Sequence, residues 1–219
     1  VVCFVGDGAI NEGAFHEALN VASLWDLPVV FVVENNQYGM GTSVERASAV
    51  TALHERGAAY GMKHLPCDGM DVLKVRDTFA DAFVRARRDK KPTFVEAITY
   101  RYRGHSMSDP AKYRTRDEVE IWQEQDPIAR FGVFLLDRKF AKPADLAAID
   151  KGVNEQIDES VTFAEESPWP AAECVYEDIY VKTPHLNWRA LEDNLSWQRS
   201  LPDDRVPATY RPRAAKGKS

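Results

Sequence analysis

The stretch that decides the fold is VGDGAINEG at residues 5–13, which continues the apolar run of residues 1–5. That run is short, rich in β-branched residues and closed by glycine, a pattern that predicts a buried strand. Apolar residues at helical spacing follow in 15–25, and a second apolar run occupies 29–33. A helix between two wholly apolar strands is typical of a parallel sheet. We therefore expect Gly6-Asp7-Gly8 at the carboxyl end of a strand.

The alternation of helical and strand patterns continues along the chain. It predicts helices near 49–60 and over 71–88, a short strand around 64–66 and a strand over 93–100. A long polar loop follows at 101–118, and one amphipathic helix is marked by apolar residues from Leu146 to Ala164. The predicted fold class is α/β, a parallel sheet flanked by helices with a C-terminal helical segment.

The expected organisation has three parts. Residues 1–140 form a ligand-binding domain, 141–181 a C-terminal helix with its closing segment, and 182–219 a tail rich in proline and charge that is extended or disordered. Because the chain begins inside a predicted strand, we expect further sequence before Val1.

Composition excludes several classes of partner. The 219 residues carry a net charge of −6, which argues against nucleic acid or an anionic membrane as the main partner. No apolar run approaches the roughly 18 residues of a membrane span. Cys3, Cys67 and Cys174 form no paired motif, which suits a reducing compartment and argues against a disulfide framework or a zinc site.

The two loops after the first strands carry oxygen ligands. In parallel sheets, ligands bind beyond the carboxyl ends of the strands. Backbone N–H groups of Gly8 and Ala9 suit a phosphate, and the Asp7 carboxylate, the Asn36 amide and the backbone oxygen of Tyr38 suit Mg²⁺. The alternative interpretation is two ordinary turns in which Asp7 caps a helix.

Two blocks of sequence carry a family resemblance. They are GDGAINEGAFHEALNVASLWDLPVVFVVENNQYGMGTSVERASA (6–49) and TYRYRGHSMSDPAKYRTRDE (99–118), and 26 residues separate Gly8 from Asn35 in the first. Both blocks resemble the alpha subunits of the thiamine-diphosphate-dependent 2-oxo acid dehydrogenases, most closely those that act on pyruvate, and the similarity covers about residues 1–180. Enzymes for branched-chain oxo acids or acetoin share the same frame and remain alternatives.

The resemblance implies a thiamine-diphosphate-binding fold, with thiamine diphosphate and Mg²⁺ as cofactors and His105 as a catalytic residue. It implies that Asp7, Asn36 and Tyr38 bind the metal. The implied cofactor-binding residues are Gly6, Asp7, Gly8, Ala9, Asn36, Tyr38, Met40 and His105. Imidazole suits this place because it titrates near neutrality and can donate to phosphate or an oxyanion, whereas a solvent-facing loop histidine is the alternative.

The resemblance also implies two candidate regulatory serines. Ser106 and Ser43 match serines that eukaryotic relatives phosphorylate, and a phosphate at Ser106 would repel a diphosphate. The third serine of the eukaryotic loop has no counterpart, which favours a bacterial origin and ordinary structural serines. The expected location is the bacterial cytoplasm, or the mitochondrial matrix in a eukaryote.

The implied reaction is decarboxylation of pyruvate and reductive acetyl transfer to a lipoyl group. The implied partners are a beta subunit, which supplies the activating glutamate, and a lipoyl-bearing acetyltransferase component. We expect the family's first sheet strands and a cofactor-binding tyrosine–arginine pair to precede Val1, so the fragment alone should bind cofactor poorly and be inactive. A truncated, non-catalytic protein that only associates with the complex is the alternative from another class.

Overall fold

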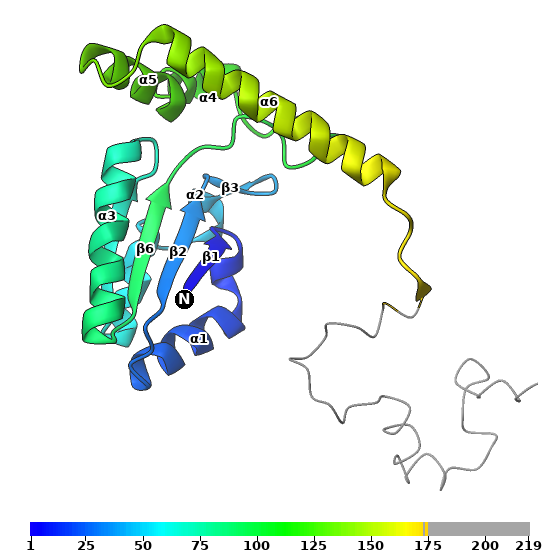
Figure 1. Ribbon diagram of the computed structural model, residues 1–219. Coiled ribbons are helices and arrows are strands. Elements are labelled where there is room, and N and C mark those ends of the chain that lie inside the picture. The colour runs from blue at the N-terminus through cyan, green and yellow to red at the C-terminus, as the bar shows by residue number, and fades with distance from the viewer. Residues whose placement is uncertain (173, 175–219) are drawn as a thin grey trace, which may run out of the picture. The chain divides into compact units, whose positions relative to one another are not determined.

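The structure, a computed structural model, describes residues 1–172 and 174 (Figure 1). The described residues fall into two units that divide after Val153, and everything that concerns the candidate site lies in the first, Val1–Val153.

A four-stranded parallel sheet forms the centre of the first unit, as the sequence predicts. Its strands are β1 (Val2–Gly6), β2 (Val30–Asn35), β5 (Lys63–Asp68) and β6 (Thr93–Ile98), in the order β1-β2-β6-β5. All neighbouring pairs are parallel, and Gly6 is in register with Glu34. The loops that follow β1 and β2 therefore leave the sheet at the same edge.

The remaining elements connect these strands and follow β6. The helices are η1 (Ala9–Asn11), α1 (Gly13–Leu24), α2 (Val44–Ala47), η2 (Leu53–Tyr60), α3 (Val72–Val84), η3 (Arg85–Asp89), α4 (Arg116–Gln123), α5 (Pro127–Asp137) and α6 (Pro143–Glu166). The short strands β3 (Tyr38–Gly39) and β4 (Thr42–Ser43) pair as a hairpin beyond β2.

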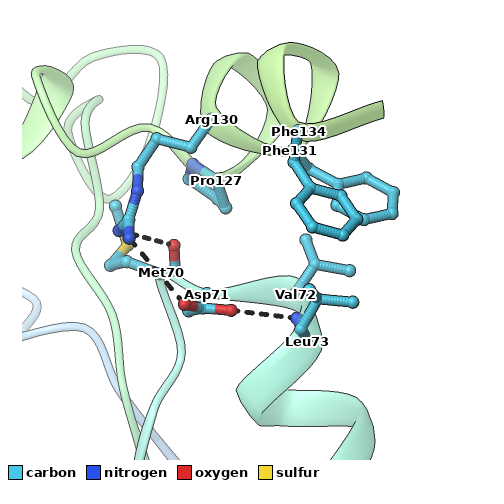
Figure 2. Close-up of a pocket in the computed structure, with 8 residues that line it drawn as sticks. All are labelled: Met70, Asp71, Val72, Leu73, Pro127, Arg130, Phe131 and Phe134. Atoms are coloured by element: carbon cyan, nitrogen blue, oxygen red, sulfur yellow. Dashed lines mark hydrogen bonds and ion pairs between the residues drawn. The ribbon is translucent and has the colours of Figure 1, made fainter. Parts of the chain in front are cut away.

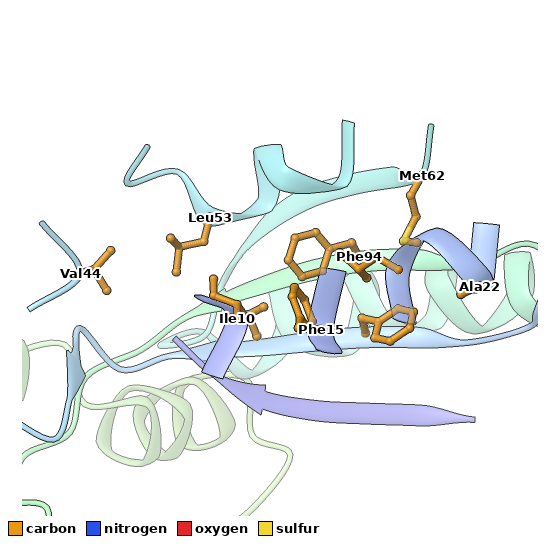
Figure 3. Packing of buried hydrophobic residues seen from close by; sticks show 10 residues of the cluster. Ile10, Phe15, Ala22, Val44, Leu53, Met62 and Phe94 are labelled. Carbon is orange, nitrogen blue, oxygen red and sulfur yellow. The ribbon is translucent and has the colours of Figure 1, made fainter. Parts of the chain in front are cut away.

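Each face of the sheet packs against its own helices. On one face, Phe15 and Leu19 of α1 join Phe31 and Phe94 of the sheet, and the Phe15 ring lies 5.8 Å from that of Phe94 (Figure 3). On the other face, α3 packs its apolar side against a second cluster that includes Val95. Phe15 and Leu19, which belong to the apolar residues at helical spacing in 15–25, are both buried. The central strands β2 and β6 are buried on both faces, which fixes the loops at the carboxyl edge. The prediction of a buried strand at residues 1–5 was wrong, because β1 lies at the edge of the sheet and its Phe4 is 63% exposed.

Some local predictions were wrong. Trp25, placed on the apolar face of the first helix, is 67% exposed because α1 ends at Leu24. The helix expected near 49–60 is a 3₁₀ helix that starts only at Leu53.

Helices α4 and α5 were not predicted. Helix α4 begins within the expected loop, where the Thr115 side chain accepts from the Glu118 backbone N–H, and α5 begins at Asp126-Pro127. Both starts follow ordinary capping chemistry that the sequence displays.

Helix α6 occupies much of the segment expected to be a C-terminal helix. The boundaries proposed at 140/141 and 181/182 stay predictions, and the expected tail at 182–219 lies outside the described residues. Within the described ranges, no helix combines the length and the apolar character that crossing a bilayer requires.

Candidate functional site

Asp7 follows β1 directly and is a buried carboxylate, with 5% of its surface exposed. Burial raises the pKa of Asp7, while hydrogen bonds from the backbone N–H groups of Asp7 and Asn36 and the nearby charge of Arg101 act in the opposite direction. The carboxylate is therefore adjacent to the second loop at the sheet edge, and a cation there would stabilise its charged form.

The turn after β2 meets the loop after β1 through two glycines. A Cβ atom placed on Gly39 would lie 3.3 Å from the Gly8 Cα and 3.8 Å from Asp7 Oδ2. Such a contact is tight, so glycine at this position allows the two backbones to approach. Gly6, Gly8 and Ala9 are exposed on the same edge, where a ligand can reach their backbone.

The donor atoms at this edge fit Mg²⁺. Asp7 offers a carboxylate, Asn36 an amide oxygen and Tyr38 a backbone carbonyl, which are the hard oxygen ligands that Mg²⁺ prefers. The Asn36 Oδ1 atom accepts one hydrogen bond from the Tyr38 backbone N–H at 3.3 Å and keeps a second lone pair. In the part of the chain that the structure describes, this edge included, no cluster of three or more His, Cys, Asp or Glu residues could hold a metal ion, so a metal here would bind one carboxylate together with amide and carbonyl oxygens.

Arg101 connects this turn to the loop that contains His105. Its Nη2 donates to the Met40 carbonyl at 2.5 Å, and its Nη1 contacts His105 Nδ1 at 3.2 Å. Because a guanidinium only donates, Nδ1 of His105 must accept and the ring proton lies on Nε2. His105 is exposed, so this N–H is available to a ligand.

Asp109 organises the His105 loop, a role that the sequence analysis missed. Its carboxylate accepts from the backbone N–H groups of His105 at 2.7 Å and Ala111 at 2.8 Å, and from the Tyr113 hydroxyl at 2.8 Å. These bonds, led by the one from His105, lower the pKa of Asp109 to about 2. The Asp-Pro pair at 109–110 was the available signal, since this dipeptide favours turns.

Glu118 of α4 also contacts the turn. Its carboxylate accepts from the Tyr38 hydroxyl at 2.8 Å and 3.1 Å and from the Tyr100 hydroxyl at 2.8 Å. Burial is the larger cause and the Glu118 carboxylate the next, and together they raise the pKa of both tyrosines to about 12. Both hydroxyls therefore stay donors at neutral pH. From the sequence, a role was predicted only for the backbone oxygen of Tyr38, and this contact of its hydroxyl was not predicted.

Comparison with known proteins identifies the family. The sequence model of the family described as dehydrogenase E1 component matches residues 1–173. The chain belongs to the dehydrogenase E1 component family. The family implies thiamine diphosphate as cofactor, and its α/β fold agrees with the parallel sheet described above.

Several relatives of this E1 chain are pyruvate dehydrogenase E1 component alpha subunits. The protein from Rickettsia bellii is 46% identical over 81% of this chain and 55% of its own length. The one from Zymomonas mobilis is 48% identical over 81% of this chain and 50% of its own length. The chloroplastic alpha-3 subunit of Arabidopsis thaliana is 44% identical over 82% of this chain and 42% of its own length. The chain thus spans about half the length of the curated relatives it matches.

The other arginines of the E1 chain's loop differ in their surroundings. Arg114 donates to the backbone carbonyls of Arg101 and Tyr102, and its guanidinium lies 5.3 Å from the centre of the Tyr100 ring. It therefore holds the loop together, whereas Arg103 and Arg116 are exposed.

The two serines expected to be regulatory lie in different places. Ser106 is exposed and its Oγ is 3.1 Å from Ser108 Oγ, while Ser43 is half-buried directly before α2. Phosphorylation of either one stays a prediction.

A separate hollow of about 160 Å³ contains none of the predicted cofactor residues of the E1 chain (Figure 2). It lies between the start of α3 and α5. Asp71 caps α3 there, and Arg130 of α5 donates to the Met70 carbonyl at 3.3 Å and pairs with Asp71 at 3.8 Å. These contacts explain the hollow as the junction of two helices.

Proposed function

We propose that this chain supplies the metal- and diphosphate-binding part of the alpha subunit in a thiamine-diphosphate-dependent pyruvate dehydrogenase. One observation carries the proposal: the buried Asp7 carboxylate lies where the loops after β1 and β2 touch at Gly8 and Gly39, with its Oδ2 atom 3.8 Å from the position of a Cβ on Gly39. The names of the relatives support pyruvate as the substrate.

Each residue at the edge then has a role. Asp7, Asn36 and the Tyr38 carbonyl hold Mg²⁺, and the backbone N–H groups of Gly8 and Ala9 face the diphosphate. Gly6 and Met40 lie next to these ligand-binding residues in the two loops. Thiamine diphosphate, when bound, supplies the electron sink that decarboxylation of a 2-oxo acid needs.

His105 acts from the facing loop. Its Nε2–H donates to oxygen that gains negative charge during the reaction, and its ring is oriented by the Arg101 contact at Nδ1. The Arg101 charge also favours an anionic substrate in this place. Orientation of the imidazole therefore depends on the contact between the two loops.

The complete site needs other chains. We propose a beta subunit as the source of the activating glutamate and a lipoyl-bearing acetyltransferase component as the acceptor of the acetyl group. The bacterial cytoplasm, or the mitochondrial matrix in a eukaryote, is the proposed location.

The test uses the full-length alpha chain co-expressed with the beta gene that neighbours it. Dye reduction is measured with pyruvate, branched-chain 2-oxo acids and acetoin, each with and without thiamine diphosphate and Mg²⁺. We expect cofactor-dependent activity that is highest with pyruvate. Preference for another substrate would contradict the substrate, and no activity with any of them would favour a non-catalytic role.

A further inference from the structure

A buried carboxylate lies behind the candidate metal site. Glu96, in the middle of β6, is 2% exposed and is in register with Val33 of β2. Its Oε1 accepts from Asn35 Nδ2 at 2.7 Å. Its Oε2 lies 2.9 Å from both the backbone N and the ring Nδ1 of His54. A charge in this position is costly unless hydrogen bonds compensate it, and here it has three such contacts.

Glu96 fixes the side chain of Asn35 in one orientation. A carboxylate only accepts, so the Asn35 NH₂ group must face it, and the Asn35 Oδ1 then accepts from the Gln37 backbone N–H at 3.0 Å. A flipped Asn35 amide would lose both bonds. The conformation of the turn therefore depends on a group on the neighbouring strand.

The turn needs this support because part of it is strained. Gln37 has a φ of +76° and Met40 a φ of +56°, which are uncommon values for residues other than glycine. Such conformations persist where surrounding contacts determine them. Asn35 supplies these contacts from its side chain to the Gln37 N–H and from its backbone carbonyl to the Thr99 N–H at 2.8 Å.

Helix η2 braces both loops of the site. Besides the contact from His54 to Glu96, Arg56 of the same helix donates to the Ile10 carbonyl at 2.7 Å and to Asn11 Oδ1 at 2.8 Å. Ile10 and Asn11 belong to η1, directly after the Gly6-Asp7-Gly8 loop. One short helix thus contacts η1, which follows the Asp7 loop, and Glu96, which binds Asn35.

We propose that Glu96, braced by His54, is a positioning residue for the metal: through Asn35 it sets the turn that presents Asn36 and Tyr38. This inference rests on the proposed function, because it assigns a purpose to the turn as a Mg²⁺ site. It adds a role for Glu96, for His54 and for the first asparagine of the pair.

The test reverses the direction of the central hydrogen bond in the full-length alpha–beta complex. In N35D the new carboxylate at position 35 lies against the Glu96 carboxylate, and neither group can donate. In E96Q the new NH₂ group at position 96 faces a donor, either the Asn35 NH₂ group or the His54 backbone N–H. In the double variant N35D/E96Q, the new amide at position 96 donates to the new carboxylate at position 35, while its oxygen accepts from His54. The dissociation constant of Mg²⁺ is measured by calorimetry with thiamine diphosphate present, together with the thermal midpoint of unfolding.

We expect each single variant to weaken Mg²⁺ binding by about 10–100-fold, the usual cost of losing a group that orients a metal ligand. The double variant should return close to the wild-type value. Electrostatics alone predicts opposite changes, because N35D adds a negative charge near the metal and E96Q removes one. T93V is the matched control: Thr93 is a fully buried polar residue of the same strand, and its hydroxyl has no partner among the described residues.

Unchanged Mg²⁺ affinity in the folded single variants, or no recovery in the double variant, would overturn the inference alone. A wild-type complex without Mg²⁺-dependent cofactor binding would overturn the proposed function, and the inference with it. If the single variants do not fold, H54A replaces them, because the His54 side chain is 19% exposed and its loss removes only one bond to Glu96. Weaker Mg²⁺ binding in H54A supports the proposal, and unchanged binding contradicts it.

Discussion

The turn at 35–40 and the loop at 99–115 both carry residues of the candidate site, but they are held in different ways. The turn depends on Glu96, a carboxylate that is 2% exposed. The loop depends on Asp109, whose bonds to His105 and Tyr113 lie near the surface. Buried hydrogen bonds are shielded from water and salt, whereas exposed ones are screened and exchange with solvent.

The two kinds of anchor suit different requirements. A metal site needs fixed ligands, and the turn has a buried anchor on a central strand. The loop has anchors near the surface, and exposed hydrogen bonds open at a lower cost than buried ones. Arg101 is one of several contacts between the turn and the loop, through the Met40 carbonyl on one side and His105 on the other.

The largest effect should come from removing the imidazole of the loop. For H105A we expect turnover to fall by about 10²–10⁴-fold, the usual contribution of a positioned proton donor, with a much smaller change in cofactor affinity. Steady-state kinetics and cofactor titration of the full complex measure the two quantities. M107A, at a fully exposed position of the same loop, is the control. Unchanged turnover in H105A would remove this residue from the mechanism.

The second prediction concerns G104A, a substitution that distorts the loop but leaves the His105 side chain in place. A Cβ on Gly104 would lie 2.5 Å from the Asp109 carbonyl oxygen, so the backbone of the loop must shift in G104A. We expect turnover to fall by about 100-fold, as for a misplaced reacting group, and Mg²⁺ affinity to stay the same. In the control G13A, the new methyl group meets no atom within 4 Å. Loss of Mg²⁺ binding in G104A would show that the turn and the loop are not independent.

The third prediction concerns the contact of the turn with α4. Y38F removes a hydrogen bond to the Glu118 carboxylate and should lower the free energy of unfolding by about 1.5 kcal/mol. Y100F removes another bond to the same carboxylate from outside the turn. Both variants should lose similar stability in denaturant titrations, but only Y38F should weaken Mg²⁺ binding. An equal effect of both on the metal would contradict the special role of the turn.

The smallest effect is the acid sensitivity of the loop. The pKa of Asp109 is lowered from 3.8 to about 2 in the folded chain, so its contribution is complete above pH 4 and is lost as the pH falls through about 2. Carbon-detected NMR of the Asp109 carboxyl should show this midpoint, and D109N should remove the acid-induced change in the loop. A midpoint near 4 would show that the hydrogen bonds of the loop do not form.

The sequence predicts the features that follow from local patterns. The apolar runs gave the strands β1 and β2, and the Gly6-Asp7-Gly8 and Asn35-Asn36 motifs gave the shared edge of the sheet. Strand register and the contact between Glu96 and Asn35 could not be predicted, because these two residues are distant in sequence and a buried carboxylate in a strand has no periodic signature. Asp109 and the capped start of α4 had readable local signals, but the loop was treated as one irregular segment.

The most direct test of the central claim is a calorimetric titration of the full alpha–beta complex with thiamine diphosphate, in Mg²⁺ and in EDTA. The wild type and D7A are compared, with D77N as a control at an exposed carboxylate. We expect saturable binding by the wild type and D77N in Mg²⁺ only, and none by D7A. Wild-type affinity in D7A would contradict the assignment of this edge of the sheet as the metal site.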